Sequence, residues 1–199
     1  MIIFVGGLIG AGKSTVAKGL AERLDYIYFD LDELKKEVYA KNPDYAESLR
    51  EGIPVTRETR VEVFERAAHD LEQLIKAHES IVVDDAMHLR EFRHMLFDVA
   101  ENMARDYLII WVRADQRIIL KRLSETKREG HVLSNPIPLH VTMARDFEDF
   151  NRAVITCSNN GTTEETLDDL FALMGKTAAF ADEQSAALPV AAHSSSPQS

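Results

Sequence analysis

The chain has 199 residues, enough for one well-packed domain, and its 23 Lys and Arg against 33 Asp and Glu give a formal net charge of −10. This acidic balance disfavours sequence-independent nucleic-acid binding through a broad basic surface, although it leaves room for a local basic groove. The single cysteine, Cys157, excludes an internal disulfide, and no apolar stretch has the length of a signal peptide or a membrane span, so we expect a cytoplasmic protein.

A glycine-rich segment near the N-terminus carries the clearest functional pattern. It matches G-x-x-x-x-G-K-S between an apolar run at residues 2–6, which predicts a strand, and a helical pattern at residues 13–24. This order is typical of a phosphate-binding loop, whose backbone N–H groups and helix N-terminus face phosphate oxygens. We expect Lys13 to reach the β- and γ-phosphates and the Ser14 hydroxyl to bind Mg²⁺. The nucleotide-binding residues would be Gly7, Leu8, Ile9, Gly10, Ala11, Gly12, Lys13, Ser14 and Thr15.

The next predicted strand, at residues 26–29, leads into a helix that begins near Leu31. Asp32 lies just past this strand, so its carboxylate would share the crevice of the phosphate loop and would orient an attacking hydroxyl or accept its proton. Lys35 follows one helical turn later and would bind an anionic substrate. The alternative is that Asp30 only caps the helix and that Lys35 is a solvated surface charge. Residues 42–55 are expected to form an irregular connection.

Two adjacent carboxylates follow the third predicted strand. A long helix at about residues 56–77 precedes this strand, which covers residues 80–83. Apolar residues followed by an acid are typical of the carboxylate that holds Mg²⁺ through water. We expect either Asp84 or Asp85 to serve the metal and the other to cap a turn. The apolar face of the long helix would carry Val61, Phe64, Ala68, Leu71 and Ile75.

Basic residues follow the fourth predicted strand. Because phosphoryl transfer needs cations near the γ-phosphate, a basic lid at about residues 126–138 would close over the nucleotide. Arg122 is the first candidate for this charge and Arg128 the second. Arg60 and Arg93 would face the phosphate acceptor, with surface salt bridges as the alternative. The elements expected in this region are a helix at 89–104, a strand at 107–112 and a helix at 115–127.

The remaining pattern completes an alternation of apolar strands and helices. We expect a turn at Asn159–Gly161, either plain or beside a nucleobase, and a disordered tail at residues 176–199 after one domain at residues 1–175. Unbroken apolar strands separated by helices predict a three-layer α/β sandwich with a parallel sheet and ligands at the carboxyl edge. The last elements expected are a helix at 139–149, a strand at 153–156 and a helix at 163–174.

These features resemble the small P-loop kinases, in the group that contains gluconate kinase, the zeta-toxin-like kinases and the polynucleotide 5′-hydroxyl kinases. The resemblance is carried by the phosphate loop, the Asp32–Lys35 step, the Val-Val-Asp-Asp-Ala stretch at 82–86 and the Arg122-Leu123 pair, within about residues 1–175. It implies a five-stranded sheet in the order 2-3-1-4-5, ATP as donor and Mg²⁺ as cofactor.

The same resemblance assigns roles to individual residues. It implies that Asp32 is the base or orienting acid and that Asp85 is the metal acid. Lys35 stands where these kinases usually have Arg, and Thr126 stands where many have a second lid Arg. Lys cannot make the planar two-point contact of Arg, so a phosphate-bearing acceptor fits this chain less well.

Four functions follow from these observations. The first is an ATP- and Mg²⁺-dependent kinase that transfers the γ-phosphate to a hydroxyl of a small metabolite or a nucleotide. The second is a nucleotide-dependent switch or adaptor ATPase that binds a partner protein, although no guanine-binding Asn-Lys-x-Asp motif is present. The third is a polynucleotide 5′-hydroxyl kinase that uses the basic stretch from Lys121 to His131. The fourth is dephospho-CoA kinase, which Gly6-Gly7-Leu8-Ile9-Gly10 resembles, although its Pro-Leu-Leu stretch is missing.

Overall fold

The computed structural model describes residues 1–41, 55–125 and 136–186. Within these ranges five parallel strands form one sheet in the order β2-β3-β1-β4-β5, which confirms the predicted order. The central position of β1 explains why it is apolar throughout, since both of its neighbours and both of its faces are covered. The strands are β1 (Ile2–Gly6), β2 (Ile27–Asp30), β3 (Ile81–Asp84), β4 (Tyr107–Arg113) and β5 (Ile155–Ser158).

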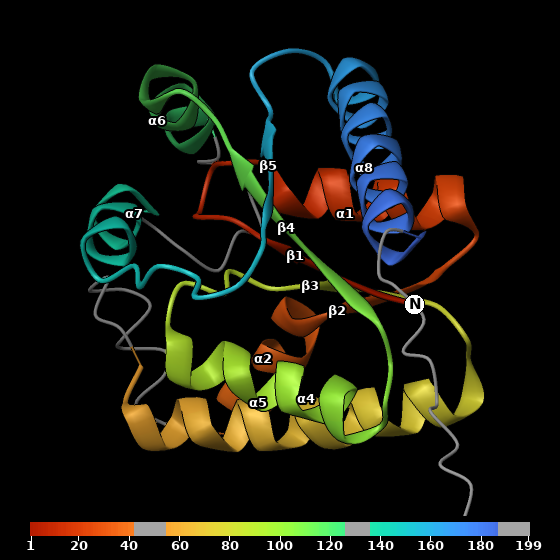
Figure 1. Ribbon diagram of the computed structural model, residues 1–199. Helices are drawn as coiled ribbons and strands as arrows, with labels where there is room; N and C mark the ends of the chain where they lie inside the picture. Colours follow the sequence, from red (N-terminus) through yellow and green to blue (C-terminus); the bar gives the residue numbers. More distant parts are fainter. Residues whose placement is uncertain (42–54, 126–135, 187–199) are drawn as a thin grey trace, which may run out of the picture.

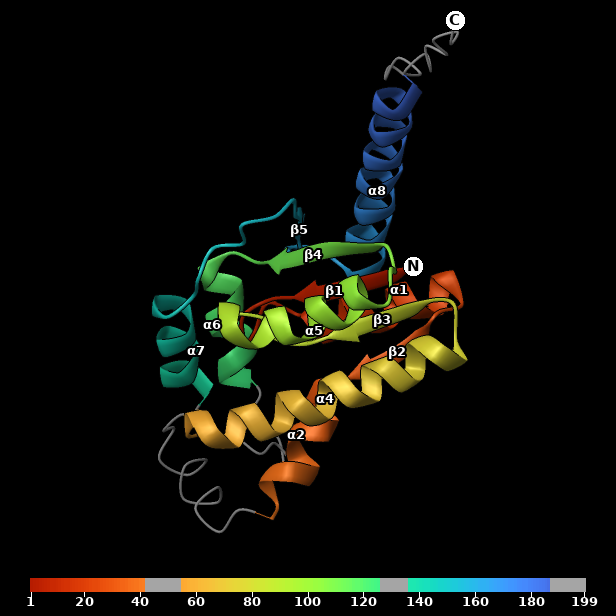
Figure 2. The same cartoon turned by 60° about the horizontal axis from the view of Figure 1, so that its bottom comes forward.

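Helices cover both faces of the sheet, so the predicted three layers are confirmed (Figure 1). The helices α1 and α8 lie on one face, and α2, α4 and α5 lie on the other. The helices α6 and α7 pack against each other beyond the carboxyl ends of the strands, as both ribbon views show (Figure 2). The bounds are α1 (Lys13–Leu24), α2 (Leu31–Tyr39), α4 (Arg57–Ala77), α5 (Arg90–Asn102), α6 (Gln116–Glu125), α7 (Pro136–Arg145) and α8 (Thr163–Ala186).

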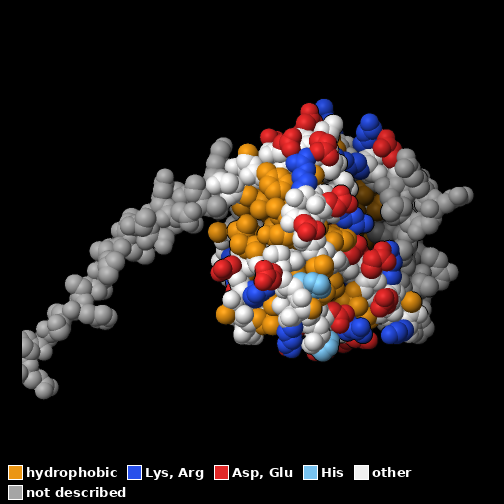
Figure 3. Space-filling model, turned by 90° about the vertical axis from the view of Figure 1, so that its right-hand side faces the viewer, with side chains coloured by type: hydrophobic (Ala, Val, Ile, Leu, Met, Phe, Trp, Pro, Cys, Tyr) orange, Lys and Arg blue, Asp and Glu red, His pale blue; other side chains and the backbone are white. Residues whose placement is uncertain are grey.

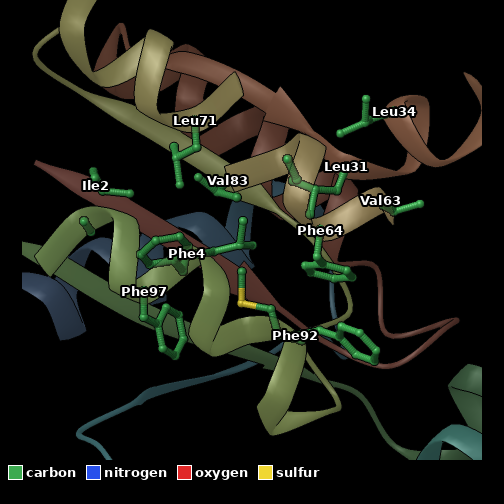
Figure 4. Close-up of a cluster of buried hydrophobic side chains, with 14 of the residues drawn as sticks. Ile2, Phe4, Leu31, Leu34, Val63, Phe64, Leu71, Val83, Phe92 and Phe97 are labelled. Carbon is green, nitrogen blue, oxygen red and sulfur yellow. The ribbon is translucent and has the colours of Figure 1, made fainter. Parts of the chain in front are cut away.

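Alternation along β1 divides the core into two clusters. Ile2 and Phe4 pack toward α4 and α5, whereas Ile3 and Val5 pack toward α1 and α8. Figure 4 shows the first cluster, in which Phe4 lies near Phe97 of α5. Because the same strand is buried on both sides, the loop at its carboxyl end is anchored by two separate apolar layers.

Several element boundaries differ from the sequence predictions. The helix α7 begins at Pro136 rather than at 139, because proline fits the first helical position, where no N–H is needed. It ends at Arg145 rather than at 149. The strand β5 lies two residues later than predicted. The helix α8 extends to Ala186 instead of ending near 174, since the alanine-rich sequence after Gly175 favours a helix and has no proline before Pro189. The long helix α4 also buries Val63 and Ala67 in place of Val61 and Ala68.

Some predictions lie outside the described residues. These are residues 42–54 of the irregular connection predicted at 42–55, residues 126–135 of the lid predicted at 126–138, with Arg128, and residues 187–199 of the disordered tail predicted at 176–199. Residues 176–186 of that predicted tail belong to α8 instead. Residues 136–138, predicted as part of the lid, form the first turn of α7. The surface in Figure 3 mixes acidic and basic side chains with hydrophobic patches, so this face offers no broad basic surface to a nucleic acid. No helix in the described part of the chain is long and apolar enough to cross a bilayer.

Candidate active site

The loop between β1 and α1 turns on two glycines with left-handed backbone angles. Gly10 has φ 86° and Gly12 has φ 85°. A Cβ atom at Gly12 would also collide with Nδ2 of Asn159, so both backbone and space require glycine there. Gly12 is the N-cap of α1 and supplies no side-chain cap, which leaves the N–H groups of the first turn open to an anion. The loop therefore has the form that a phosphate cradle requires.

Lys13 is held at the centre of the site and does not extend into solvent. Its side chain is 11% exposed, and its Nζ lies 3.5 Å from both Asp32 Oδ2 and Asp84 Oδ1 and donates to Ser14 Oγ at 3.2 Å. Burial alone would lower the pKa of the Lys13 ammonium, but the carboxylates of Asp32 and Asp84 outweigh it and raise this pKa. The cation predicted to bind phosphate is thus charged and in place before any ligand arrives.

Asp84, rather than Asp85, lies beside the phosphate loop. It pairs in register with Val5 of β1 and Asp30 of β2, and the hydroxyl of Tyr28 donates to its Oδ2 at 2.8 Å. Its other oxygen, Oδ1, is buried without a hydrogen-bond partner among the described residues and faces Lys13. Burial raises the pKa of this carboxyl, and Lys13 and Ser14 offset the effect only in part.

Asp85 points to a different partner. Its Oδ1 accepts from Lys35 Nζ at 2.5 Å and its Oδ2 accepts from Met87 N at 2.8 Å. Burial would raise the pKa of Asp85, but Lys35 lowers it below the usual range. The resemblance implies the metal role for Asp85, whose carboxylate is paired with Lys35 and Met87 N, whereas Asp84 is the acid that lies 3.5 Å from Lys13. The physical reason is the alternation of β3, in which Asp84 shares the α1 face with Val82.

Asp32 and Lys35 form the half of the site that is open to solvent. The Asp32 side chain is 49% exposed, and Lys35 Nζ donates to its Oδ1 at 2.8 Å. The Lys35 ammonium, supported by Lys13, holds the pKa of Asp32 far below its usual range despite burial. Lys35 is therefore already neutralised by two carboxylates, and the interpretation of it as a solvated surface charge is wrong. Asp30 caps α2 by accepting from Asp32 N, as the alternative interpretation of that residue predicted.

Arg122 contacts the outside of the phosphate loop. It donates through Nη1 to the carbonyl of Ala11 at 3.2 Å and through Nη2 to the carbonyl of Asn159 at 3.0 Å. The structure places this guanidinium next to the loop, and its predicted role toward the γ-phosphate stays a prediction.

Arg93 is not in the open site. The residue is 0% exposed, donates to the carbonyls of Met87 and Asp149, and stacks on the Phe150 ring with 4.3 Å between Cζ and the centroid. It ties α5 to the segment before β5, so the prediction of a substrate contact is wrong. The charge of Arg60 helps to lower the pKa of His88 and of Asp146, and the predicted contact of Arg60 with an acceptor stays a prediction.

Two residues at the loop were not found from the sequence. Asn159, which was considered only as part of a turn or a base site, is buried and donates through Nδ2 to the carbonyl of Ala11 at 2.9 Å. His140 of α7 places Nδ1 2.8 Å from the carbonyl of Ile9. Both contacts join residues more than a hundred positions apart, for which the local sequence carries no signal.

The residues present fit a magnesium ion that is bound mainly by phosphate and water. The Ser14 hydroxyl stands at the start of α1. Oδ1 of Asp84 accepts no hydrogen bond from the described residues and lies 3.5 Å from Lys13 Nζ, so it could accept from a metal-bound water. The described residues include no group of three or more acidic, His or Cys side chains that would form a protein cage. Mg²⁺ rarely uses such a cage in nucleotide sites, so the donor set and the expected ion agree.

Comparisons with known proteins identify similar chains. The model of the AAA domain family matches residues 3–134. The shikimate kinase of Rippkaea orientalis is 28% identical over 134 residues, which cover 63% of this chain and 71% of that protein. A putative adenylate kinase of Thermococcus kodakarensis is 26% identical over 183 residues, with 87% and 85% covered.

A solved structure extends the similarity to the whole fold. The gluconokinase from Sinorhizobium meliloti superposes with a TM-score of 0.69 at 22% identity, covering 92% of this chain and 96% of that one. At this identity the superposition shows the shared fold. The resemblance of the sequence to small P-loop kinases is confirmed.

Proposed function

The chain belongs to the AAA domain family and has the fold of the small P-loop kinases, and we propose that it is an ATP- and Mg²⁺-dependent kinase whose acceptor is a hydroxyl group of a small metabolite. The observation that carries the proposal is the cluster of Lys13, Asp32 and Asp84 at the mouth of the phosphate loop. Phosphoryl transfer needs a phosphate cradle, a cation and a carboxylate that can reach the acceptor. Here the Lys13 ammonium at the loop lies 3.5 Å from the solvent-exposed carboxylate of Asp32.

The donor side follows from the loop. The N–H groups at the start of α1 and the Lys13 ammonium would bind the triphosphate, and Ser14 with Asp84 would hold Mg²⁺, which offsets negative charge on the phosphates when bound. Lys13 now pairs with two carboxylates, so nucleotide binding would shift it toward phosphate oxygens and release part of that pairing. In this proposal Arg122 supports the loop and does not carry the developing charge.

The acceptor side follows from Asp32 and Lys35. A carboxylate whose pKa is far below the usual range is a weak base, so Asp32 would first orient the acceptor hydroxyl and take its proton only as the new bond forms. Lys35 fixes the Asp32 carboxylate through a 2.8 Å hydrogen bond and shares its charge with Asp85. Because both carboxylates already satisfy Lys35, the site favours an uncharged hydroxyl group over a phosphate-bearing acceptor.

The experiment that tests the proposal is a panel of hydroxyl acceptors with γ-labelled ATP and Mg²⁺. The panel would contain sugars, sugar acids, hydroxy acids, nucleosides, dephospho-CoA and oligonucleotides with a 5′-hydroxyl. Label transferred to one acceptor class supports the kinase. Label released only as phosphate to water, whatever acceptor is present, would favour the switch or adaptor ATPase instead.

A further inference from the structure

Consecutive carbonyls on the outside of the phosphate loop accept hydrogen bonds from distant side chains. Nδ1 of His140 lies 2.8 Å from the carbonyl of Ile9, and the His140 residue is only 7% exposed. A carbonyl oxygen can only accept, so Nδ1 carries the hydrogen and donates. This bond joins α7 directly to the middle of the glycine loop.

Two further donors reach the next carbonyls. Arg122 of α6 donates through Nη1 to Ala11 at 3.2 Å and to Gly10 at 3.5 Å. Asn159, which follows β5, donates through Nδ2 to Ala11 at 2.9 Å, while its Oδ1 accepts from the hydroxyl of Thr166 at 3.1 Å. Because the carbonyl of Ala11 can only accept, the end of the Asn159 amide that faces the loop is its nitrogen. Donors from three separate elements therefore hold the carbonyls of Ile9, Gly10 and Ala11.

Peptide geometry links these outer bonds to the inner face of the loop. In a planar trans peptide the C=O of one residue and the N–H of the next point in opposite directions. A donor that holds the Ile9 carbonyl outward thus turns the N–H of Gly10 inward, and a donor on the Ala11 carbonyl does the same for the N–H of Gly12. Both glycines have φ near 85° and lack a Cβ, so their own conformational preference is weak and outside contacts must select the orientation.

We propose that His140, together with Arg122 and Asn159, is a positioning residue that preorganises the phosphate loop by holding its outer carbonyls. The inference rests on the proposed function, because it concerns how that loop binds a triphosphate. Removing one donor would let the loop adopt other peptide orientations, and ATP would then bind at the cost of restoring the correct one. Such a cost reduces affinity without removing any atom that touches the nucleotide.

The test compares two substitutions at position 140. His140→Phe keeps an aromatic ring but removes the hydrogen-bond donor. His140→Asn removes the ring but places an amide N–H donor at the position of Nδ1. The probes are ATP and inorganic tripolyphosphate, each with Mg²⁺, measured by calorimetry. Loss of one hydrogen bond predicts that His140→Phe binds both probes roughly two- to tenfold more weakly. His140→Asn is expected to bind both within about twofold of the unsubstituted protein.

Controls separate positioning from general damage. Val141→Ala alters the next residue of α7, whose side chain is 60% exposed, and is expected to leave binding unchanged. Asn159→Asp replaces the second donor by an oxygen that repels the Ala11 carbonyl, and it tests the proposal independently if His140→Phe does not fold. With an acceptor in hand, the KM for ATP is expected to rise in His140→Phe while kcat changes little.

Two results would overturn the inference. The first is that both variants, His140→Phe and Asn159→Asp, bind ATP and tripolyphosphate as tightly as the unsubstituted protein does. The other is His140→Asn losing as much affinity as His140→Phe, which would mean that the ring and not the donor matters. Failure of the unsubstituted protein to bind ATP would instead contradict the proposed function, so the two claims fail separately.

Discussion

At the scale of single residues, the chemistry of the site depends on which of several neighbouring carboxylates performs which task. Asp84 is 1% exposed and faces Lys13, while Asp32 is half exposed and faces the open side of the site. The buried carboxylate suits a role toward the metal, and the exposed one suits a role toward an acceptor. In the proposed function, their positions on either side of the Lys13 ammonium would let one site hold donor and acceptor together.

Asp32→Asn tests the acceptor role most directly. The amide keeps the size of the side chain but cannot take a proton, so ATP affinity is expected to stay within about threefold while transfer falls by roughly 10²- to 10⁴-fold. Binding would be measured by calorimetry and transfer with labelled ATP. The matched control is Glu33→Gln, since Glu33 is exposed and pairs with Lys36 on the surface of α2. Unchanged transfer in Asp32→Asn would assign the role to another group.

The sequence predicts some residue roles and not others, for physical reasons. Lys13 follows from the glycine spacing because the loop and helix are local structures. The choice of Asp84 over Asp85 was available from period-two alternation, since Val82 and Asp84 lie on one face of β3. The contacts of Arg93, His140 and Asn159 were not available, because each side chain binds a backbone carbonyl that only the folded chain brings near.

At the scale of elements, the connection from β1 to α1 depends on glycine where the backbone is left-handed. Gly12→Ala would add a Cβ at φ 85° and against the Asn159 amide. We expect this variant to fold with reduced stability and to bind ATP at least tenfold more weakly, because the first turn of α1 must move. Gly175→Ala is the control, since no atom lies within 4 Å of a Cβ at that position. Equal ATP affinity in both variants would contradict this account.

The connection from β3 to α5 predicts a pH dependence of stability through His88. Burial is the main cause that lowers the pKa of His88 to about 4, and the positive charges of Arg60 and Lys35 lower it further. The carboxylates of Asp85 and Asp146 oppose this effect but do not outweigh it. The unfolded chain, with an ordinary value of 6.5, then binds more protons between these two pH values. The contribution of His88 therefore makes the free energy of unfolding smaller as the pH falls from 6.5 toward 4. Above pH 6.5 His88 has no effect on the pH dependence of stability.

Urea unfolding at pH 7.0, 5.5 and 4.5 would measure this effect. His88→Gln does not titrate, so its free energy of unfolding is expected to fall less steeply over this range than that of the unsubstituted protein. His69→Gln, at an exposed position of α4, serves as the control and should follow the unsubstituted protein. Parallel curves for all three proteins would show that His88 does not carry the dependence.

Element prediction succeeded where periodicity decides and failed where tertiary contacts decide. The limits of α1 were predicted without error because the glycine loop fixes its start and its apolar face ends at Leu24. The limits of α7 were missed because Pro136 and Pro138 were interpreted as loop residues, although Pro136 occupies the first helical position. The position of α7 matters for the proposed role of His140, which lies about one turn into this helix and contacts the carbonyl of Ile9.

At the scale of the whole molecule, the site rests on a sheet whose two faces are both packed. Phe97 of α5 is fully buried, stacks on Tyr107 of β4 and meets Phe4 of β1 edge to face. Phe97→Ala is expected to lower the free energy of unfolding by about 3–5 kcal/mol, since it leaves a cavity beneath the central strand. Leu120→Ala, at a position 37% exposed, is expected to cost under about 1 kcal/mol.

Urea unfolding followed by tryptophan fluorescence would measure both variants, because Trp111 lies in β4 next to the central strand. A loss for Phe97→Ala no larger than that for Leu120→Ala would contradict the assignment of this cluster as the core. The apolar runs predicted a parallel sheet covered on both faces, whereas the order of its strands followed only from the resemblance to the P-loop kinases. Alternation along β1 predicts only that its side chains divide between two faces, as the two core clusters show.

The central claim is that the glycine loop holds the phosphates of a nucleoside triphosphate with Lys13 supplying charge. Calorimetric titration of ATP in magnesium buffer into the unsubstituted protein and into Lys13→Ala tests it, with Lys36→Ala as a surface control. We predict saturable binding of one ATP by the unsubstituted protein and by Lys36→Ala, and loss of at least tenfold in affinity in Lys13→Ala. Absence of ATP binding by the unsubstituted protein, or equal binding by Lys13→Ala, would contradict the account.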